Sequence, residues 1–279
     1  MTRLSTPDRQ SKIRLGGMAL ANGVLVHGPR YWACAVRLDG GGIKVASGEK
    51  PVWAAGTDRR LLRGPLRMAE ILALLPVVRR ELPEAQLPFQ RPGVAGALVG
   101  SAVAIRAVRE SRLPALTREA ISALFAVAPA AAALRGSSLA EYHGAEHISI
   151  GTYEHGKPRE REHERCGSHV LGPLLVTSAA GNLLARRAPV HLRPLARLAA
   201  GVGALAASTE IFAWMVANDR HPVARALARP GHELQHRMVT AEPTPEQLEV
   251  ANAALGECLR LESGEGGARD QDPEEAPPT

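Results

Sequence analysis

Aromatic residues and cysteines are scarce in this 279-residue chain, and each shortage argues against a class of protein. Phe, Trp and Tyr together make up 3% of the residues, whereas Ala, Leu and Val fill the apolar stretches. Because small aliphatic side chains suit close-packed helices better than a β-sandwich, this composition predicts a mainly helical fold. The three cysteines, Cys34, Cys166 and Cys258, lack CxxC spacing, so we expect reduced thiols in the cytoplasm and no disulfide framework.

An export signal and a nucleic-acid-binding pattern are also missing. The first residues, MTRLSTPDRQSKIRLGG, lack the apolar core of a signal peptide. The formal charge is +6, and the body is more basic than this total, since six acidic residues and one arginine follow Leu261. The arginines interrupt apolar runs and do not alternate with aromatics that could stack on bases. We therefore expect membrane lipid, and no nucleic acid, as the partner of this charge.

The composition changes along the chain and predicts a small β-rich unit followed by a larger helical domain. Strands are expected at 24–26 and 32–36, and the glycine-rich residues 39–42 predict a turn. The predicted boundaries are 1–13 for a disordered N-terminus, 14–60 for the β-rich unit, 61–261 for a helical, membrane-embedded domain and 262–279 for a disordered acidic tail.

Proline and glycine predict breaks within the helical domain. Residues 61–82 fit a helix that is interrupted at Pro65 and Pro76. The tripeptide RPG, residues 229–231, predicts a turn. An amphipathic helix is expected from about Thr244, because leucine and alanine recur there at a spacing of three to four residues.

Four apolar runs of this domain are candidates for membrane helices. As helices, 92–105 and 120–134 would be ~22 Å long, shorter than the ~30 Å hydrocarbon layer, so neither is expected to span a bilayer alone. The runs 167–185 and 198–218 predict a helical hairpin whose arginine-rich connection faces the cytoplasm. The alternative is a hairpin buried in a soluble protein. Glu210 lies in the last run, where a carboxylate is costly and usually paired or functional.

The segment YHGAEHISIGTYEHG contains a motif typical of metal sites. A capping box, SLAE, predicts that a helix begins just before it, and Gly156 is expected to end that helix. On this helix His143 and His147 would lie ~40° apart and one turn apart, a separation from which two imidazoles reach one metal ion. The string HGAEH also matches the H-x-x-E-H pattern, in which two histidines bind zinc and the glutamate, here Glu146, is the general base.

Further candidate donors follow the helix. Five of the ten histidines lie within 27 consecutive residues, and His163 and Cys166 could complete a tetrahedral N/S site, which favours zinc. Glu154 would lie ~10 Å further along the helix than His147, so we expect it, with Arg165, to support the ligands or bind substrate. If one loop donor stays outside, water can occupy the fourth position; four protein ligands would make the zinc structural. The alternative is that these histidines are surface or capping residues.

Several blocks of the sequence resemble, in order, the YqhQ-like family of bacterial membrane proteins, for which metal-dependent enzyme activity has been suggested. The blocks are GGMALANGVLVHGP, YHGAEHISIGTYE, HERCGSH, STEIF, HPVARALARPG and EPTPEQLEVANAAL. The resemblance covers about 16–259 and implies an integral membrane protein. It places a metal site on His143, His147 and the His163/Cys166 pair, and implies Glu146 and Glu210 as functional carboxylates. It implies no substrate.

Three functions fit these observations. The first is a membrane-embedded, zinc-dependent hydrolase in which Glu146 takes a proton from water. The second is a zinc-stabilised membrane protein that binds or regulates a partner without catalysis. The third is an ion or solute carrier that uses Glu210 and the histidine cluster.

Overall fold

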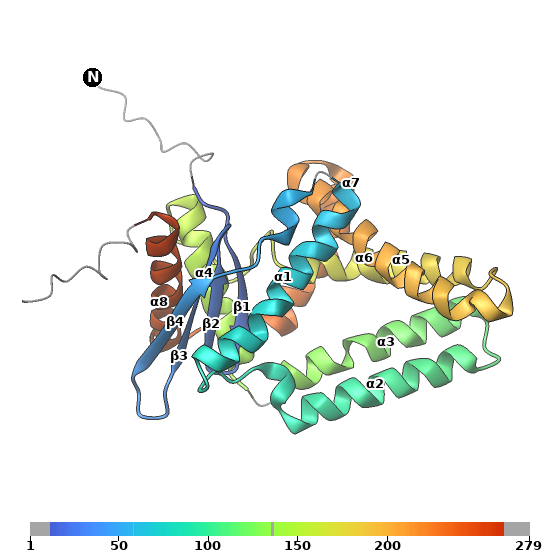
Figure 1. The fold of residues 1–279 in the computed structure, drawn as a ribbon, viewed down its shortest axis with the longest axis horizontal. Coiled ribbons are helices and arrows are strands. Elements are labelled where there is room, and N and C mark those ends of the chain that lie inside the picture. The colour runs from blue at the N-terminus through green and yellow to red at the C-terminus, as the bar shows by residue number, and fades with distance from the viewer. Residues whose placement is uncertain (1–11, 58, 135–136, 265–279) are drawn as a thin grey trace, which may run out of the picture.

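A four-stranded sheet and eight α-helices make up the computed structural model, which describes residues 12–57, 59–134 and 137–264 (Figure 1). This architecture confirms the predicted mainly α fold with a small β-rich N-terminal unit. The expected disordered ends lie almost entirely outside the described residues. The strands are β1 (Gly16–Leu20), β2 (Gly23–His27), β3 (Tyr31–Arg37) and β4 (Ile43–Glu49), and the helices are α1 (Arg60–Glu81), α2 (Pro92–Glu110), α3 (Ala115–Leu134), α4 (Leu139–His155), α5 (Ser168–Ala185), α6 (Arg193–Ala217), α7 (Pro222–Leu234) and α8 (Pro245–Glu262).

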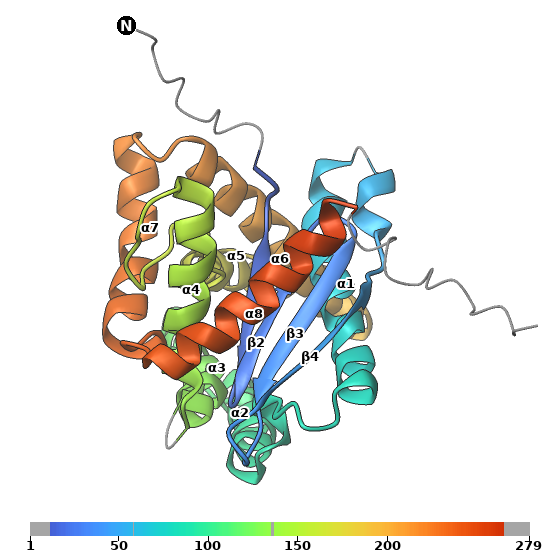
Figure 2. The same ribbon diagram turned by 90° about the vertical axis from the view of Figure 1, so that its left-hand side faces the viewer.

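The sheet is an antiparallel meander in the order β1-β2-β3-β4, and helices cover both of its faces. Alternate residues of β2 and β3 point to opposite sides, as the period of two requires. Val24 and Ala35 are buried against α4 and α8, which lie across one face (Figure 2). Leu25 and Cys34, the adjacent residues on these two strands, are buried with α1 on the other face. The predicted strands and the turn at 39–42 are confirmed.

The prediction that α1 breaks at its prolines was wrong. The helix is continuous through Pro65 and Pro76. A proline removes one backbone hydrogen bond, and burial of neighbouring apolar side chains can offset that cost. Leu74 and Val78 are fully buried against the sheet on either side of the second proline, and they hold the helix in place.

Other helix ends confirm part of what the sequence predicted. Gly156 ends α4 with a φ of 67°, and Thr244 opens α8 with a capping box. Ser138 precedes α4 but makes no side-chain cap hydrogen bond, so the capping box predicted there is not formed. The turn predicted at RPG is also absent, because α7 continues through Pro230 and Gly231.

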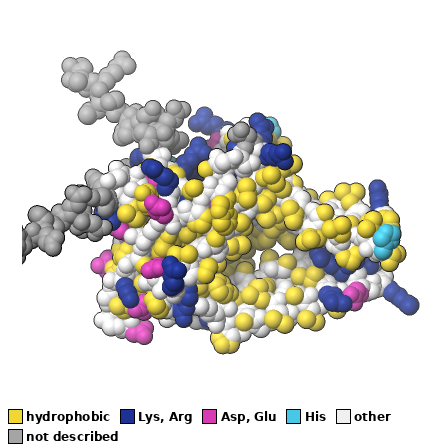
Figure 3. Space-filling view, viewed as in Figure 1, with side chains coloured by type: hydrophobic (Ala, Val, Ile, Leu, Met, Phe, Trp, Pro, Cys, Tyr) yellow, Lys and Arg dark blue, Asp and Glu magenta, His cyan; other side chains and the backbone are white. Residues whose placement is uncertain are grey.

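Two helical hairpins, α2/α3 and α5/α6, extend away from the sheet; we call them the apolar arms (Figure 1). The predicted hairpin with an arginine-rich connection is confirmed as α5/α6. Hydrophobic side chains cover much of the arms, and basic side chains gather near their far ends (Figure 3). The large hydrophobic residues exposed on the arms include Leu98, Val99, Val103, Leu116, Leu124, Phe125, Val176, Leu184, Leu195, Leu198 and Val202.

Two helical segments of the described chain are long and apolar enough to cross a membrane. One is α3, and the other is Val190–Ala217, which includes α6. The run 120–134 is part of a longer helix than its uncharged residues suggested, because α3 begins at Ala115 and has 20 residues. The added turn contains Leu116, so the helix gains apolar length that the uncharged run alone did not show.

Candidate metal centre

Helix α4 is held between the sheet and the chain that follows α7, and this packing fixes the orientation of its histidines. Tyr142, Ala145 and Ile150 join the core that α4 shares with the sheet. On another side Gly144 faces the segment after α7, where a Cβ would lie 2.1 Å from the Ala241 carbonyl oxygen. A side chain at position 144 would therefore push this segment away.

His143, His147 and Cys166 bring three metal-binding atoms together, all within 4.8 Å of one another. The Cys166 Sγ atom lies 3.5 Å from His143 Nε2, and the centroids of the two imidazole rings lie 4.3 Å apart. Zinc bond lengths of ~2.1 Å to nitrogen and ~2.3 Å to sulfur imply donors about 3.4–3.6 Å apart in a tetrahedral site. The sulfur and the first imidazole already meet this spacing, and small rotations of the side chains would bring in His147.

Backbone carbonyl groups orient both imidazoles. His143 Nδ1 lies 2.8 Å from the Val239 carbonyl oxygen, and His147 Nδ1 lies 2.6 Å from that of Arg161. A carbonyl oxygen only accepts, so each Nδ1 carries the proton and donates it, which leaves the Nε2 lone pair free. This arrangement is typical of histidine ligands of metals. Val239 ends a π-helix, Gln235–Val239, a rare element that is frequent at functional sites.

Glu146 completes the centre as a buried carboxylate without a hydrogen-bond partner at Oε2. Burial raises its pKa to about 7; the nearby His143 opposes this shift and Cys166 adds to it. Its Oε1 lies against β1, where a Cβ at Gly17 would be 2.4 Å away. A carboxyl group that titrates near neutrality beside metal-binding donors has the properties of a general base.

The contact between Gly17 and Glu146 predicts a strong coupling between the two positions. Gly17→Ala is expected to lower the free energy of unfolding by about 1–3 kcal/mol, because the new methyl group overlaps the carboxylate. In a Glu146→Ala background the same change should cost much less. Urea denaturation monitored by tryptophan fluorescence measures the free energy of unfolding of the wild type, the two single variants and the double variant. Equal costs in both backgrounds would contradict the contact. Gly96→Ala, where nothing lies within 4 Å of the new Cβ, is the control.

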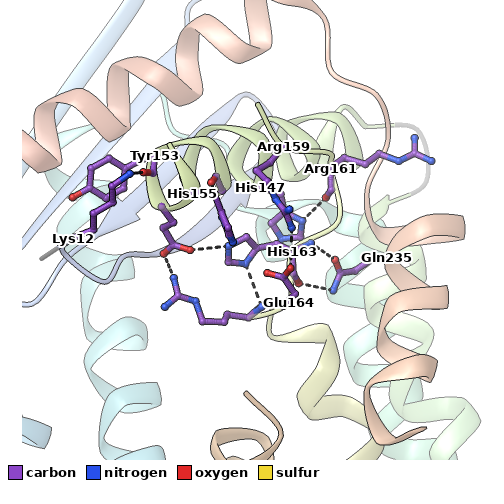
Figure 4. A network of polar contacts seen from close by, with 12 residues as sticks. Lys12, His147, Tyr153, His155, Arg159, Arg161, His163, Glu164 and Gln235 are labelled. Atoms are coloured by element: carbon purple, nitrogen blue, oxygen red, sulfur yellow. Dashed lines mark hydrogen bonds and ion pairs between the residues drawn. The ribbon is translucent and has the colours of Figure 1, made fainter. Parts of the chain in front are cut away.

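His163, a predicted ligand, is directed elsewhere in this structure. Its Nε2 lies 3.2 Å from Glu154 Oε2, and its Nδ1 accepts a hydrogen bond from the Arg165 backbone N–H (Figure 4). Glu154 also forms an ion pair with the Arg165 guanidinium. Both ring nitrogens of His163 are therefore occupied, and Cys166 is the loop residue that joins the histidine pair. Glu154 and Arg165 fix the loop after α4, beside the centre.

Gln235 is a part of the centre that the sequence analysis missed. Its buried side chain accepts a hydrogen bond from His163 N and donates to the carbonyl oxygen of His163 and to Ser168 Oγ (Figure 4). It also lies 2.9 Å from His169 Nε2. These contacts join the loop to the start of α5 and to the π-helix. A single glutamine carries no recognisable motif, so no signal in the sequence marked it.

Glu210 does not join the three donors. It lies in α6, in the lining of an open cavity of about 590 Å³ between α5, α6 and α7. Within the described ranges no hydrogen bond or ion pair connects its carboxylate to another residue. The sequence therefore singled out a carboxylate at a different place from the metal centre.

Comparison with known proteins agrees with the resemblance seen in the sequence. Residues 136–261 match a family described as "Protein of unknown function (DUF1385)". The chain is 34% identical over 131 residues to "Uncharacterized protein YqhQ" of Bacillus subtilis (strain 168); this stretch covers 44% of the chain and spans only 41% of that relative's length. No solved structure matches. Residues 136–261, which contain all four residues of the candidate centre, are therefore the part of the chain that is similar to the YqhQ-like family.

Proposed function

We propose that the chain is a zinc-dependent hydrolase of the cell membrane, in which His143, His147 and Cys166 hold the ion and Glu146 is the general base. The observation that carries this proposal is the buried, unpartnered Glu146 Oε2 beside three converging donor atoms. Two nitrogens and one sulfur suit zinc, and three protein ligands are the number found in catalytic zinc sites. When bound, zinc would supply a Lewis acid that polarises a carbonyl or phosphoryl oxygen.

The residues of the chain would then orient and move protons. The Val239 and Arg161 carbonyl groups hold the imidazoles in one tautomer, so their Nε2 atoms remain available. As a carboxylate, Glu146 accepts a proton from the attacking water. Because burial places its pKa near 7, the protonated side chain can return that proton to the leaving group at neutral pH. Burial of the side chain also limits access of bulk water to this proton.

The apolar arms support a location in the membrane with lipid as a partner. Only 6% of the apolar window of α3 is buried, whereas the core helix of a soluble protein would be mostly buried. Leu116 and Leu124 on this helix are 75% and 70% exposed. Such a surface is favourable in hydrocarbon and unfavourable in water. Each arm is a hairpin, so the chain leaves and re-enters the bilayer on the same side.

The distribution of basic residues supports an orientation of the α5/α6 arm. Arg186 and Arg187 lie in its connection, Arg193 and Arg197 lie at the start of α6, and no acidic residue lies between Gly167 and Thr209. By the positive-inside rule this connection faces the cytoplasm. The same arginines would contact anionic lipid headgroups. They are not interleaved with the aromatic residues that nucleic-acid binding would require.

A pair of purified proteins tests the catalytic part of the proposal. The wild-type chain should hydrolyse members of a panel of ester, amide and phosphoester substrates, lose this activity with a chelator and regain it with zinc. Glu146→Gln should keep the zinc and lower kcat by about 10²–10⁴, the usual contribution of a general base. A variant that retains both zinc and full activity would refute the role of Glu146. Zinc binding without hydrolysis in either protein would favour the alternative, a zinc-stabilised protein that binds or regulates a partner.

A further inference from the structure

A second candidate site lies at the base of the α5/α6 arm, in the cavity that contains Glu210. The volume of about 590 Å³ is within the range of small-molecule sites. All three helices contribute to the lining, which is almost entirely apolar: Pro173 and Val176 from α5, Ile211 and Trp214 from α6, and Leu227 and Pro230 from α7.

Glu210 is the one residue with a charged side chain in this lining. It is half-buried, and no other described residue forms a hydrogen bond or an ion pair with its carboxylate. A carboxylate beside apolar groups is costly unless a positive charge or a proton compensates it. The arginines of α7 nearest in sequence to the lining, Arg225 and Arg229, are exposed and make no ion pair with it. Within the described residues, no ion-pair partner therefore compensates the Glu210 carboxylate in this cavity.

The surroundings of Glu210 indicate the chemistry of a compensating ligand. Trp214 is one helical turn further along α6, lines the same cavity and is 40% exposed. Indole rings and carboxylates both attract organic ammonium ions. The remaining walls offer no further charge, so they suit an alkyl chain. A free inorganic cation would make no apolar contact with these walls.

We propose that this cavity binds an amphiphile with a cationic head, with its ammonium group beside Glu210 and its alkyl chain against the walls formed by α5 and α7. This site is separate from the metal centre and its residues are not donors there. It is nevertheless linked to the centre through the chain, since α5 starts two residues after Cys166 and α7 runs into the π-helix whose Val239 carbonyl orients His143.

Binding measurements on the full chain in an uncharged detergent test this assignment. The probes are dodecyltrimethylammonium, dodecyl sulfate, which has the same chain length and the opposite charge, and choline, which has the head without the chain. We expect the wild-type protein to bind the alkylammonium at least about tenfold more tightly than either other probe. Only the alkylammonium has both a positive charge for Glu210 and an alkyl chain that can pack against the apolar walls. Calorimetry or quenching of Trp214 fluorescence measures the binding. The variant Trp214→Phe shows which part of the fluorescence change comes from Trp214.

A matched pair of variants isolates the contribution of Glu210. Glu210→Gln keeps the shape of the side chain and should abolish the preference for the cationic probe. Glu110→Gln removes an equal charge from an exposed position in α2 and should leave the preference unchanged. Equal binding of the cationic and anionic probes by the wild-type protein would overturn the proposal, as would a preference that survives in Glu210→Gln. Choline binding as tight as that of the alkylammonium would refute the role of the apolar walls.

Discussion

Cys166→Ser is expected to remove most of the zinc from the purified protein and to lower zinc affinity by at least about 100-fold. Loss of groups that only orient metal ligands already costs about 10–100-fold, so loss of a direct ligand should cost more. Cys166 Sγ is the single sulfur among the three converging donors, and no other described cysteine joins this group. A serine oxygen is a poor replacement because zinc sites of this kind are built from thiolate and imidazole. His143→Ala should have an effect of similar size.

Metal analysis of proteins purified in zinc-buffered solution measures this effect. The wild-type chain should contain about one zinc ion, as expected for a single three-donor site. Two histidines of the same segment provide the controls. His155→Ala and His163→Ala should retain the zinc, because His155 Nδ1 faces the Gly151 carbonyl oxygen and both nitrogens of His163 have other partners. Zinc loss in His163→Ala together with zinc retention in Cys166→Ser would show that the donor set is wrong.

Leu124→Lys is expected to release the chain from the membrane, or to prevent its insertion. Leu124 is 70% exposed and lies at the middle of α3, so in a bilayer it would face lipid near the centre of the hydrocarbon layer. A lysine there costs about 3 kcal/mol on insertion scales, which is roughly a 100-fold change in the inserted fraction. Adding Val202→Lys, on α6, should increase the effect. In water, by contrast, both substitutions at exposed positions would be nearly neutral.

Membrane fractionation measures the share of the protein that stays bound to the membrane. It is done at neutral pH, because the lysine must remain charged. Membranes are washed with urea, and the bound and released chain are quantified. Val45→Lys is the control, because Val45 is also an exposed apolar residue but lies in β4, outside the apolar arms. The variant in β4 should remain membrane-bound like the wild type. Retention of Leu124→Lys at the wild-type level would contradict insertion of α3, and the exposed hydrophobic surface would then need a protein partner.

The candidate metal centre shows how far the sequence could predict a site. His143 and His147 were predictable because the regular geometry of a helix places residues i and i+4 on one face, whatever surrounds it. The choice of Cys166 over His163 was not predictable. It depends on hydrogen bonds that Glu154 and Gln235 accept from His163 and that fix the loop after α4. Gln235 is 72 residues away from His163 in the chain. The environment of Glu146 likewise depends on contact with Gly17, far away in the N-terminal strand.

For the fold as a whole, the sequence by itself determined the helical class, the two central strands, the α5/α6 hairpin and the spacing of the histidine pair. All of these follow from local periodicity and turn chemistry. Only the tertiary structure decided that α1 continues through Pro65 and Pro76, since burial against the sheet offsets the lost backbone hydrogen bonds. It also decided that few residues of α3 are buried. A buried core helix and a lipid-facing helix share the same apolar composition, and only the neighbours that pack against a helix distinguish the two.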